Sequence, residues 1–211
     1  VIGILGNIIW LFILILFLLI AFAATKYKYD IKEKMGVCEK RKGMRSVENV
    51  LANGFVPFVL SFLTVPSQHY PTFPKEVGDI MFISAISAAT ADTFASEIGV
   101  LSPNAYMITN LKKVKPGTNG AVSLLGNSVA FSSSFFISSV GWLSFSIFSV
   151  PLPRNDYLIL LPIFAGFIGC QIDSILGATL ERKILNKDRV NLISITIAVL
   201  MVWVLTYKIG W

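Results

Sequence analysis

Long apolar stretches separated by short polar segments make up most of this chain. Each stretch approaches or exceeds the roughly 20 residues that an α-helix needs to cross a bilayer. The six stretches are Val1–Ala24, Val47–Val65, Val77–Leu101, Thr118–Val150, Tyr157–Leu180 and Val190–Ile209. We therefore predict an all-α integral membrane protein, with a single domain over residues 1–211 built as a bundle of about six transmembrane helices. The chain begins with Val rather than Met, which leaves open whether further residues precede it.

The composition excludes an ordinary soluble domain. Hydrophobic residues make up 55% of the chain and charged residues only 14%, whereas about 25% of residues are charged in typical soluble domains. The net charge of +6 does not indicate a nucleic-acid partner, because the basic residues lie between the apolar stretches, where membrane orientation requires them. The two cysteines, Cys38 and Cys170, do not make a disulfide framework.

Basic residues are concentrated in alternate loops, which predicts the orientation in the membrane. The loops after the first, third and fifth stretches hold 15 of the 18 basic residues. These residues are Lys26, Lys28, Lys32, Lys34, Lys40, Arg41, Lys42 and Arg45, then Lys112, Lys113 and Lys115, and finally Arg182, Lys183, Lys187 and Arg189. The positive-inside rule places these three loops in the cytoplasm and both termini outside, in the cell membrane if the source is prokaryotic.

Three of the acidic side chains within the apolar stretches are candidates for a functional site. Asp92 and Glu97 belong to the third stretch and Asp173 to the fifth. An Asp at the centre of a membrane helix costs roughly 2.5–3.5 kcal/mol, so such residues need a partner or a function. Carboxylate oxygens are ligands that Mg²⁺ prefers. Asp92 and Glu97 are separated by about 140° on an ideal helix, so they can share one metal only if the helix end unwinds.

Two stripes of polar side chains are predicted along helix faces, each with the spacing i, i+4, i+8. The first stripe consists of Arg45, Asn49 and Asn53, and the second of Asn119, Ser123 and Asn127. Amide and guanidinium groups can bind phosphate oxygens, although buried polar residues in membrane helices also bond simply to neighbouring helices.

The segment before the fourth stretch has the features of an anion site. Lys112 and Lys115 precede a Pro-Gly turn and Thr118, which we predict to be the N-cap of the fourth helix. Free N–H groups and the helix dipole favour an anion at such a position. The lysines could also serve only as orientation signals. No Walker A pattern is present, so the chain is not a P-loop enzyme.

The predicted topology brings these groups together. Helices two and four leave the cytoplasm and helices three and five return to it, so the polar end of each lies at the inner surface. We therefore expect one site there, built from all four helices.

At these motifs the sequence resembles an integral membrane family that includes plant and cyanobacterial phytyl-phosphate kinases and animal transmembrane-protein-19-like proteins. The matching stretches are residues 45–54 (ending Asn-Val-Leu-Ala-Asn-Gly), 89–99 (with Ala-Asp-Thr-Phe-Ala-Ser-Glu-Ile-Gly), 115–126 (with Thr-Asn-Gly-Ala-Val-Ser-Leu-Leu-Gly) and 169–181 (with Asp-Ser-Ile-Leu-Gly-Ala-Thr-Leu-Glu). The resemblance implies transfer of a nucleotide γ-phosphate, with CTP the expected donor, to an isoprenyl monophosphate such as phytyl or geranylgeranyl phosphate.

With this activity, the acids would be both the catalytic residues and the Mg²⁺ ligands. Asp92 and Asp173 are the expected principal ligands, and Glu97 is a further ligand or orienting group. The expected residues for binding phosphate and substrate are Arg45, Asn49, Asn53, Lys112, Lys115, Thr118, Asn119, Ser123, Asn127 and Ser174. Phosphoryl transfer needs mainly positioning and charge neutralisation, which such a set supplies.

Three other functions remain open from the sequence. An ion-coupled secondary transporter also uses intramembrane acids, usually near the midplane and between repeats. No repeat is visible here. A cytidylyltransferase acting on a lipid phosphate would release pyrophosphate instead of a nucleoside diphosphate. A non-enzymatic scaffold would tolerate loss of Asp92 or Asp173.

Overall fold

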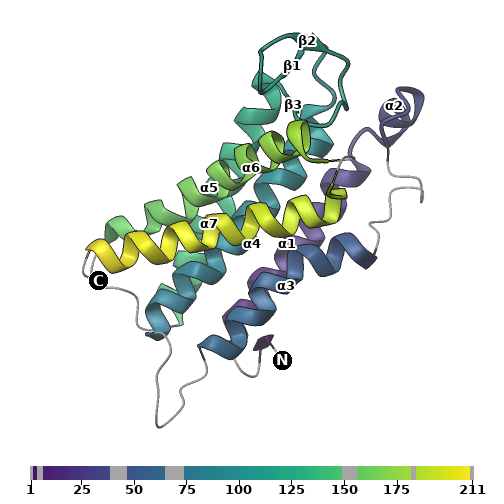
Figure 1. Ribbon diagram of the computed structural model, residues 1–211. Coiled ribbons are helices and arrows are strands. Elements are labelled where there is room, and N and C mark those ends of the chain that lie inside the picture. Colours follow the sequence, from purple (N-terminus) through teal and green to yellow (C-terminus); the bar gives the residue numbers. More distant parts are fainter. Residues whose placement is uncertain are drawn as a thin grey trace.

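The helices of the chain pack side by side, with a small sheet at one end (Figure 1). The computed structural model describes residues 2–3, 7–38, 47–64, 74–148, 156–181 and 184–209. The α-helices are α1 (Ile8–Lys26), α2 (Tyr29–Lys34), α3 (Val47–Leu63), α4 (Lys75–Gly99), α5 (Leu124–Ile147), α6 (Leu160–Thr179) and α7 (Lys187–Ile209). A 3-10 turn, η2 (Asp156–Ile159), precedes α6, and the strands are β1 (Ala105–Met107), β2 (Lys113–Val114) and β3 (Ala121–Val122).

Helix α4 is the central element of the bundle. It packs against α1, α3, α5, α6 and α7, and every residue from Val77 to Ala91 is buried. Its middle is rich in Ala and Ser, and such small side chains let the backbones of neighbouring helices approach closely. Because α4 is enclosed by other helices, Asp92 and Glu97 near its C-terminal end lie among protein groups.

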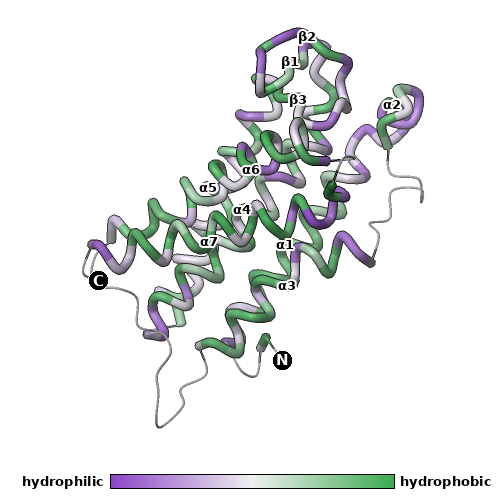
Figure 2. The backbone as a smooth tube through the Cα atoms, in the orientation of Figure 1, coloured by the Kyte–Doolittle hydropathy of each residue, from purple (hydrophilic) through white to green (hydrophobic). Residues whose placement is uncertain are grey.

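The length and hydropathy of the helices confirm an integral membrane protein. Among the described residues, α1, α4, α5, α6 and α7 are long and apolar enough to cross a membrane, and α3 is a shorter apolar helix. Figure 2 shows that hydrophobic residues run along the helices, whereas hydrophilic residues gather at the end that carries α2 and the strands. The prediction of about six spans therefore agrees with five long helices and one short one.

The loop after α4 forms a small antiparallel sheet that the sequence did not predict. The strand order is β2-β1-β3, with Ala105 opposite Val114 and Tyr106 opposite Val122. This sheet occupies residues that the sequence analysis assigned in part to the fourth helix. It folds the basic loop back over the end of the bundle.

The predicted start of the fourth helix at Thr118 is wrong. Helix α5 begins at Leu124, and its N-cap is Ser123, whose Oγ accepts from the backbone N–H of Gly126 at 3.0 Å. Gly117 and Gly120 have φ of 84° and 75°, in the left-handed region. Because a right-handed α-helix requires negative φ, no helix can run through these residues. The stripe predicted from residue 119 to residue 127 therefore does not lie on one helix.

Serine side chains join α4, α5 and α6 in the middle of the bundle. The Ser87 Oγ is 2.8 Å from the Ser134 Oγ and 3.1 Å from the Ser138 Oγ. The Ser134 Oγ donates to the Ile163 carbonyl at 2.5 Å. Gly166 on α6 lies directly against Ser87 and Ser134, so α6 can come this close only because residue 166 has no side chain.

Gly166→Ala is expected to destabilise the protein. The added Cβ would collide with the Oγ atoms of Ser87 and Ser134 and lie 2.9 Å from the Ser87 Cβ. Overpacking of this kind costs about 1–3 kcal/mol. Thermal unfolding in detergent would show a lower midpoint. Gly54→Ala in α3 is the matched control: a Cβ there meets nothing within 4 Å, so its midpoint should not fall. Equal midpoints for the two variants would contradict the close approach.

Candidate functional site

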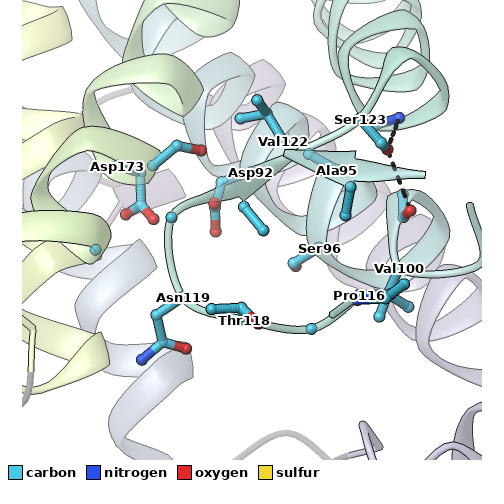
Figure 3. Close-up of a pocket in the computed structure, with 18 of the residues that line it drawn as sticks. Asp92, Ala95, Ser96, Val100, Pro116, Thr118, Asn119, Val122, Ser123 and Asp173 are labelled. Carbon is cyan, nitrogen blue, oxygen red and sulfur yellow. Dashed lines mark hydrogen bonds between the residues drawn. The ribbon is translucent and has the colours of Figure 1, made fainter. Parts of the chain in front are cut away.

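A pocket opens at the end of the bundle where α4 and α6 meet the loop between α4 and α5. Its volume is about 190 Å³. Asp92 and Ser96 of α4, Asp173 and Ser174 of α6, and the turn of residues 116–120 line its walls. Figure 3 shows Asp92 and Asp173 beside one another, with Thr118 and Asn119 on the opposite wall.

Asp92 and Asp173 form an acidic pair in this pocket. Both side chains are half-buried, and their carboxyl groups are close enough to interact. The Ser194 Oγ of α7 lies 3.1 Å from Asp173 Oδ2 and 2.9 Å from the Asn191 carbonyl, so its hydroxyl is shared between the two acceptors and the Asp173 carboxylate lies against α7. Two neighbouring carboxylates repel one another unless a cation lies between them or a proton is shared. The pair is therefore suited to share a proton or to hold a cation.

The turn of residues 116–120 is held rigidly opposite the acids. The Asn119 side chain donates to Glu181 Oε1 at 2.6 Å. Gly120 packs so closely on α6 that a Cβ there would lie 2.6 Å from the Cα of Ala178. Its positive φ and this close approach both require glycine. The turn is thus anchored to the C-terminal end of α6 and to Glu181 just beyond it.

Ser123 and Asn127 complete the wall formed by the start of α5. The Ser123 Oγ donates to the Gly99 carbonyl at the end of α4, at 3.2 Å. Asn127 accepts from Gln171 of α6 at 3.3 Å. The two residues line the pocket with Asn119, as the sequence predicted, although the shared helix face from which that was inferred does not exist.

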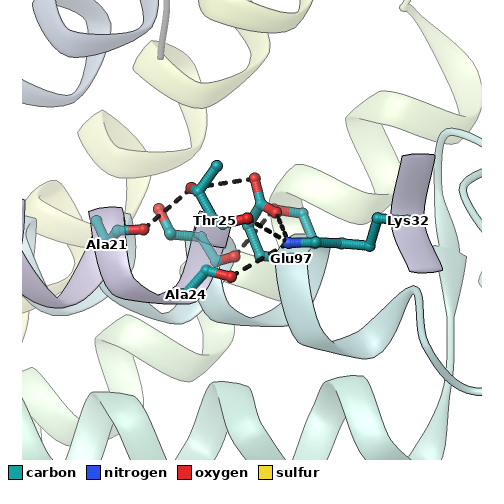
Figure 4. Close-up of polar contacts among 7 residues, drawn as sticks. Ala21, Ala24, Thr25, Lys32 and Glu97 are labelled. Carbon is teal, nitrogen blue, oxygen red and sulfur yellow. Dashed lines mark hydrogen bonds and ion pairs between the residues drawn. The ribbon is translucent and has the colours of Figure 1, made fainter. Parts of the chain in front are cut away.

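Glu97 lies outside the pocket, in an ion pair that the sequence analysis missed. Its Oε2 is 2.6 Å from the Nζ of Lys32, whose side chain is only 2% exposed. Figure 4 shows that the Lys32 Nζ also donates to the carbonyls of Ala24 and Thr25 at the end of α1. Glu97 thereby ties α4 to α1 and α2, and the structure does not bring it together with Asp92 and Asp173.

Several predicted phosphate-binding residues do not line the pocket. Asn49 and Asn53 are buried in α3, where Asn53 donates to the Asn49 side chain at 3.1 Å. Lys112 and Lys115 are exposed on the loop. Arg45 lies outside the described residues. The pocket thus unites the motifs of the third, fourth and fifth predicted helices, and the second contributes no described lining residue.

The oxygen donors of the pocket are of the kind that a hard cation such as Mg²⁺ prefers. Among the described residues, no group of three or more His, Cys, Asp or Glu side chains could hold a metal ion. Mg²⁺ is commonly held by one or two carboxylates together with waters and substrate phosphates. The pair Asp92 and Asp173 supplies two carboxylates, with the oxygens of Ser174, Asn119 and Asn127 in the same pocket.

The three basic loops meet at this pocket. Val37 comes from the segment after α2, Gly117 from the loop between α4 and α5, and Lys187 is the first residue of α7, directly after the third basic segment. The alternation of basic and apolar segments had predicted that these loops share one side. Glu181, which the sequence places on the acidic face of the fifth predicted helix, lines the pocket. Lys187 was not predicted there, because the basic residues of its segment were interpreted only as orientation signals.

Comparisons with known proteins place these features in a family. The family described as "Integral membrane protein DUF92" matches residues 1–200. The chain is 33% identical over 206 residues to the uncharacterized membrane protein MJ0933 of Methanocaldococcus jannaschii, covering 91% of this chain and 79% of that protein. It is 33% identical over 186 residues to the chloroplastic protein VTE6 of Arabidopsis thaliana, covering 86% of this chain.

A cyanobacterial relative adds to this group. The uncharacterized membrane protein sll0875 of Synechocystis is 29% identical over 192 residues, covering 85% of this chain and 69% of that protein. The chain spans about half of VTE6, 54% of its length. No solved structure matches the chain.

Proposed function

The chain belongs to the DUF92 family of integral membrane proteins, and we propose that it transfers the γ-phosphate of a nucleoside triphosphate, CTP being the expected donor, to an isoprenyl monophosphate. An oxygen of the acceptor phosphate attacks the γ-phosphorus, the bond between that phosphorus and the β–γ bridging oxygen breaks, and a nucleoside diphosphate leaves. The acceptor phosphate is already largely ionised, so the reaction requires no strong general base. The product is an isoprenyl diphosphate.

The acidic pair carries this proposal. Asp92 and Asp173 come from two different helices and meet in a pocket at the polar end of an apolar bundle. Membrane proteins keep carboxylates at this depth where they have a function. Opposite the pair lies a fixed turn with amide and hydroxyl groups, which suits phosphate oxygens. Phosphoryl transfer depends on this combination of positioning and charge neutralisation.

The size of the pocket suits the phosphates and not the whole substrates. Its volume of about 190 Å³ is below the roughly 300–1,000 Å³ of sites that enclose a complete ligand. The polyphosphate would lie inside, and the nucleoside and the isoprenyl tail would extend from it. A site at the bundle end gives the nucleoside access to water and the tail access to lipid.

Aromatic side chains on α5 and α6, one turn or more beyond the pocket residues, support an apolar acceptor. Phe131 lies one turn along α5 from Asn127, and its ring contacts those of Phe164 and Phe167 of α6. Phe131 and Phe164 are 42% and 49% exposed on the outside of the bundle. An isoprenyl chain leaving the pocket between α5 and α6 would meet this apolar surface.

A bound Mg²⁺ would neutralise the phosphate charge and orient the donor. Asp92 and Asp173 would hold it, and Ser194 keeps Asp173 in position through its hydrogen bond. Asn119 would orient phosphate oxygens from the opposite wall, and Ser123 would hold the start of α5 against α4 through its hydrogen bond to Gly99. Glu97 would act at a distance, by fixing the end of α4 against α1.

The motif resemblance supports the choice of substrate class. The stretches around Asp92, Asn119 and Asp173 resemble those of phytyl-phosphate kinases, and they are the stretches that build the pocket. A transporter is less consistent with this position, because carrier sites usually lie near the midplane between repeats. The reaction products distinguish the kinase from a cytidylyltransferase.

The test is to incubate the purified protein in detergent with Mg²⁺, CTP and phytyl or geranylgeranyl monophosphate. The expected products are the isoprenyl diphosphate and CDP, quantified by mass spectrometry. A CDP-lipid with pyrophosphate would establish a cytidylyltransferase and contradict the kinase. Coupled solute uptake into proteoliposomes without nucleotide turnover would establish a carrier. ATP, GTP and UTP in parallel reactions would define the donor.

A further inference from the structure

Lys187 is the one basic side chain among the described residues that line the pocket. It is the first residue of α7 and is exposed. The same pocket contains the carboxylates of Asp92, Asp173 and Glu181. The formal charge of these four side chains is −2, which attracts a divalent cation but repels a free polyphosphate. A phosphate donor therefore needs both a metal and a fixed cation to enter.

Other described lysines near this end of the bundle either form hydrogen bonds of their own or do not line the pocket. Lys32 is buried and its Nζ bonds to Glu97 and two carbonyls, which uses its three donors. Lys113 donates to Asn104 at 2.9 Å. Lys112 and Lys115 are exposed and do not line the pocket. Among the described residues, Lys187 is therefore the lysine that can contact a phosphate in the pocket.

The backbone of Lys187 is fixed relative to the acidic pair. Helix α7 packs on α6 and α4, and its Ser194 donates to Asp173, two turns from the helix start. Lys187 is close enough to Asp173 for a favourable charge interaction. Its long, exposed side chain can turn from the carboxylate towards an arriving phosphate while its backbone stays in place. The helix start adds a favourable dipole for an anion.

We propose that Lys187 binds the β- and γ-phosphates of the nucleotide, opposite the Asp92–Asp173 pair, and so completes the pocket as a site for a metal–triphosphate complex. This assignment rests on the proposed phosphoryl-transfer function. A Lys ammonium acts here as a mobile point charge with three donors, a common way of holding phosphates. It contacts the substrate directly, and it neutralises part of the charge that the acids leave uncompensated.

The test compares Lys187→Gln with Arg189→Gln. Both variants remove one exposed positive charge from the first turn of α7, but Arg189 does not line the pocket. Losing a charge-assisted hydrogen bond weakens binding roughly 10- to 100-fold. The KM for the nucleotide should rise by this factor in Lys187→Gln and stay unchanged in Arg189→Gln. The KM for the isoprenyl phosphate should change little. Lys187→Arg, which keeps the charge, should recover part of the loss.

A second measurement does not depend on turnover. Magnesium tripolyphosphate should raise the thermal midpoint of the wild-type protein in detergent, and Lys187→Gln should reduce that increase, whereas Arg189→Gln should retain it. If the wild type binds tripolyphosphate but shows no kinase activity, the proposed function fails and the role of Lys187 can still be measured. If Lys187→Gln binds tripolyphosphate and nucleotide as tightly as the wild type, the role of Lys187 is overturned.

Discussion

Asp92→Asn and Asp173→Asn are each expected to lower the rate of phosphate transfer by at least about 10²- to 10³-fold, the effect of removing one preorganised electrostatic group from an active site. An amide keeps the size of the carboxylate but removes the negative charge that would hold Mg²⁺. The rate is measured as isoprenyl diphosphate formed with Mg²⁺ and CTP in excess. The loss should persist at saturating nucleotide, because it affects the transition state and not only binding.

The same two variants should not be less stable than the wild type. Asp92 and Asp173 repel one another when both are charged, so one amide relieves that repulsion and the thermal midpoint stays equal or rises. Asp79→Asn is the matched control. Asp79 lies on α4 about 20 Å along the helix from Asp92, buried, where it accepts from Trp10 at 2.6 Å. An Asn there can still accept that bond, so activity should be retained. Full activity in Asp92→Asn and Asp173→Asn would overturn the site and favour a scaffold.

Lys32→Met is expected to destabilise the protein more than any other single change considered. It leaves the Glu97 carboxylate, whose side chain is 15% exposed, without its ion-pair partner, and two carbonyls of α1 without a donor. Breaking a buried pair by removing one partner costs roughly 3–5 kcal/mol, and the partial exposure of Glu97 favours the lower end. The thermal midpoint in detergent should fall accordingly.

The double variant Lys32→Met with Glu97→Gln tests whether the pair itself is responsible. Neutralising Glu97 removes the uncompensated charge, so the double variant should be more stable than Lys32→Met alone. Lys34→Met removes an exposed lysine from the same short helix and should have little effect. If Lys32→Met were as stable as Lys34→Met, the ion pair would contribute nothing and Lys32 would be an orientation signal only.

The alternation of apolar and basic segments predicted the architecture and the clustering of three loops at one end. Hydrophobic length and loop charge are local properties, so the sequence carries them directly. The pairing of Asp92 with Asp173 was also predictable, because helices that cross in opposite directions bring their polar ends to the same side. The side of the membrane on which this end lies stays a prediction.

Other features depended on how the segments pack. Thr118 and Asn119 have the composition of a helix start, but left-handed glycines and pairing with β1 place them in a turn beside a small sheet. Glu97 was expected at the site as a further metal ligand or an orienting group, and it instead faces Lys32. The rotation of about 140° from Asp92 was predictable, but not that this direction leads to α1 and α2.

From its sequence alone, this protein was determined to be a membrane bundle with carboxylates, amides and hydroxyls gathered at one end. Only the tertiary structure decided which of those groups share a pocket, which lysine joins them and which lysine is used to hold α1 to α4. The physical reason is that hydropathy and charge counts act on each segment separately. The direction in which a side chain points depends on the rotation of each helix against its neighbours, and packing between segments sets that rotation.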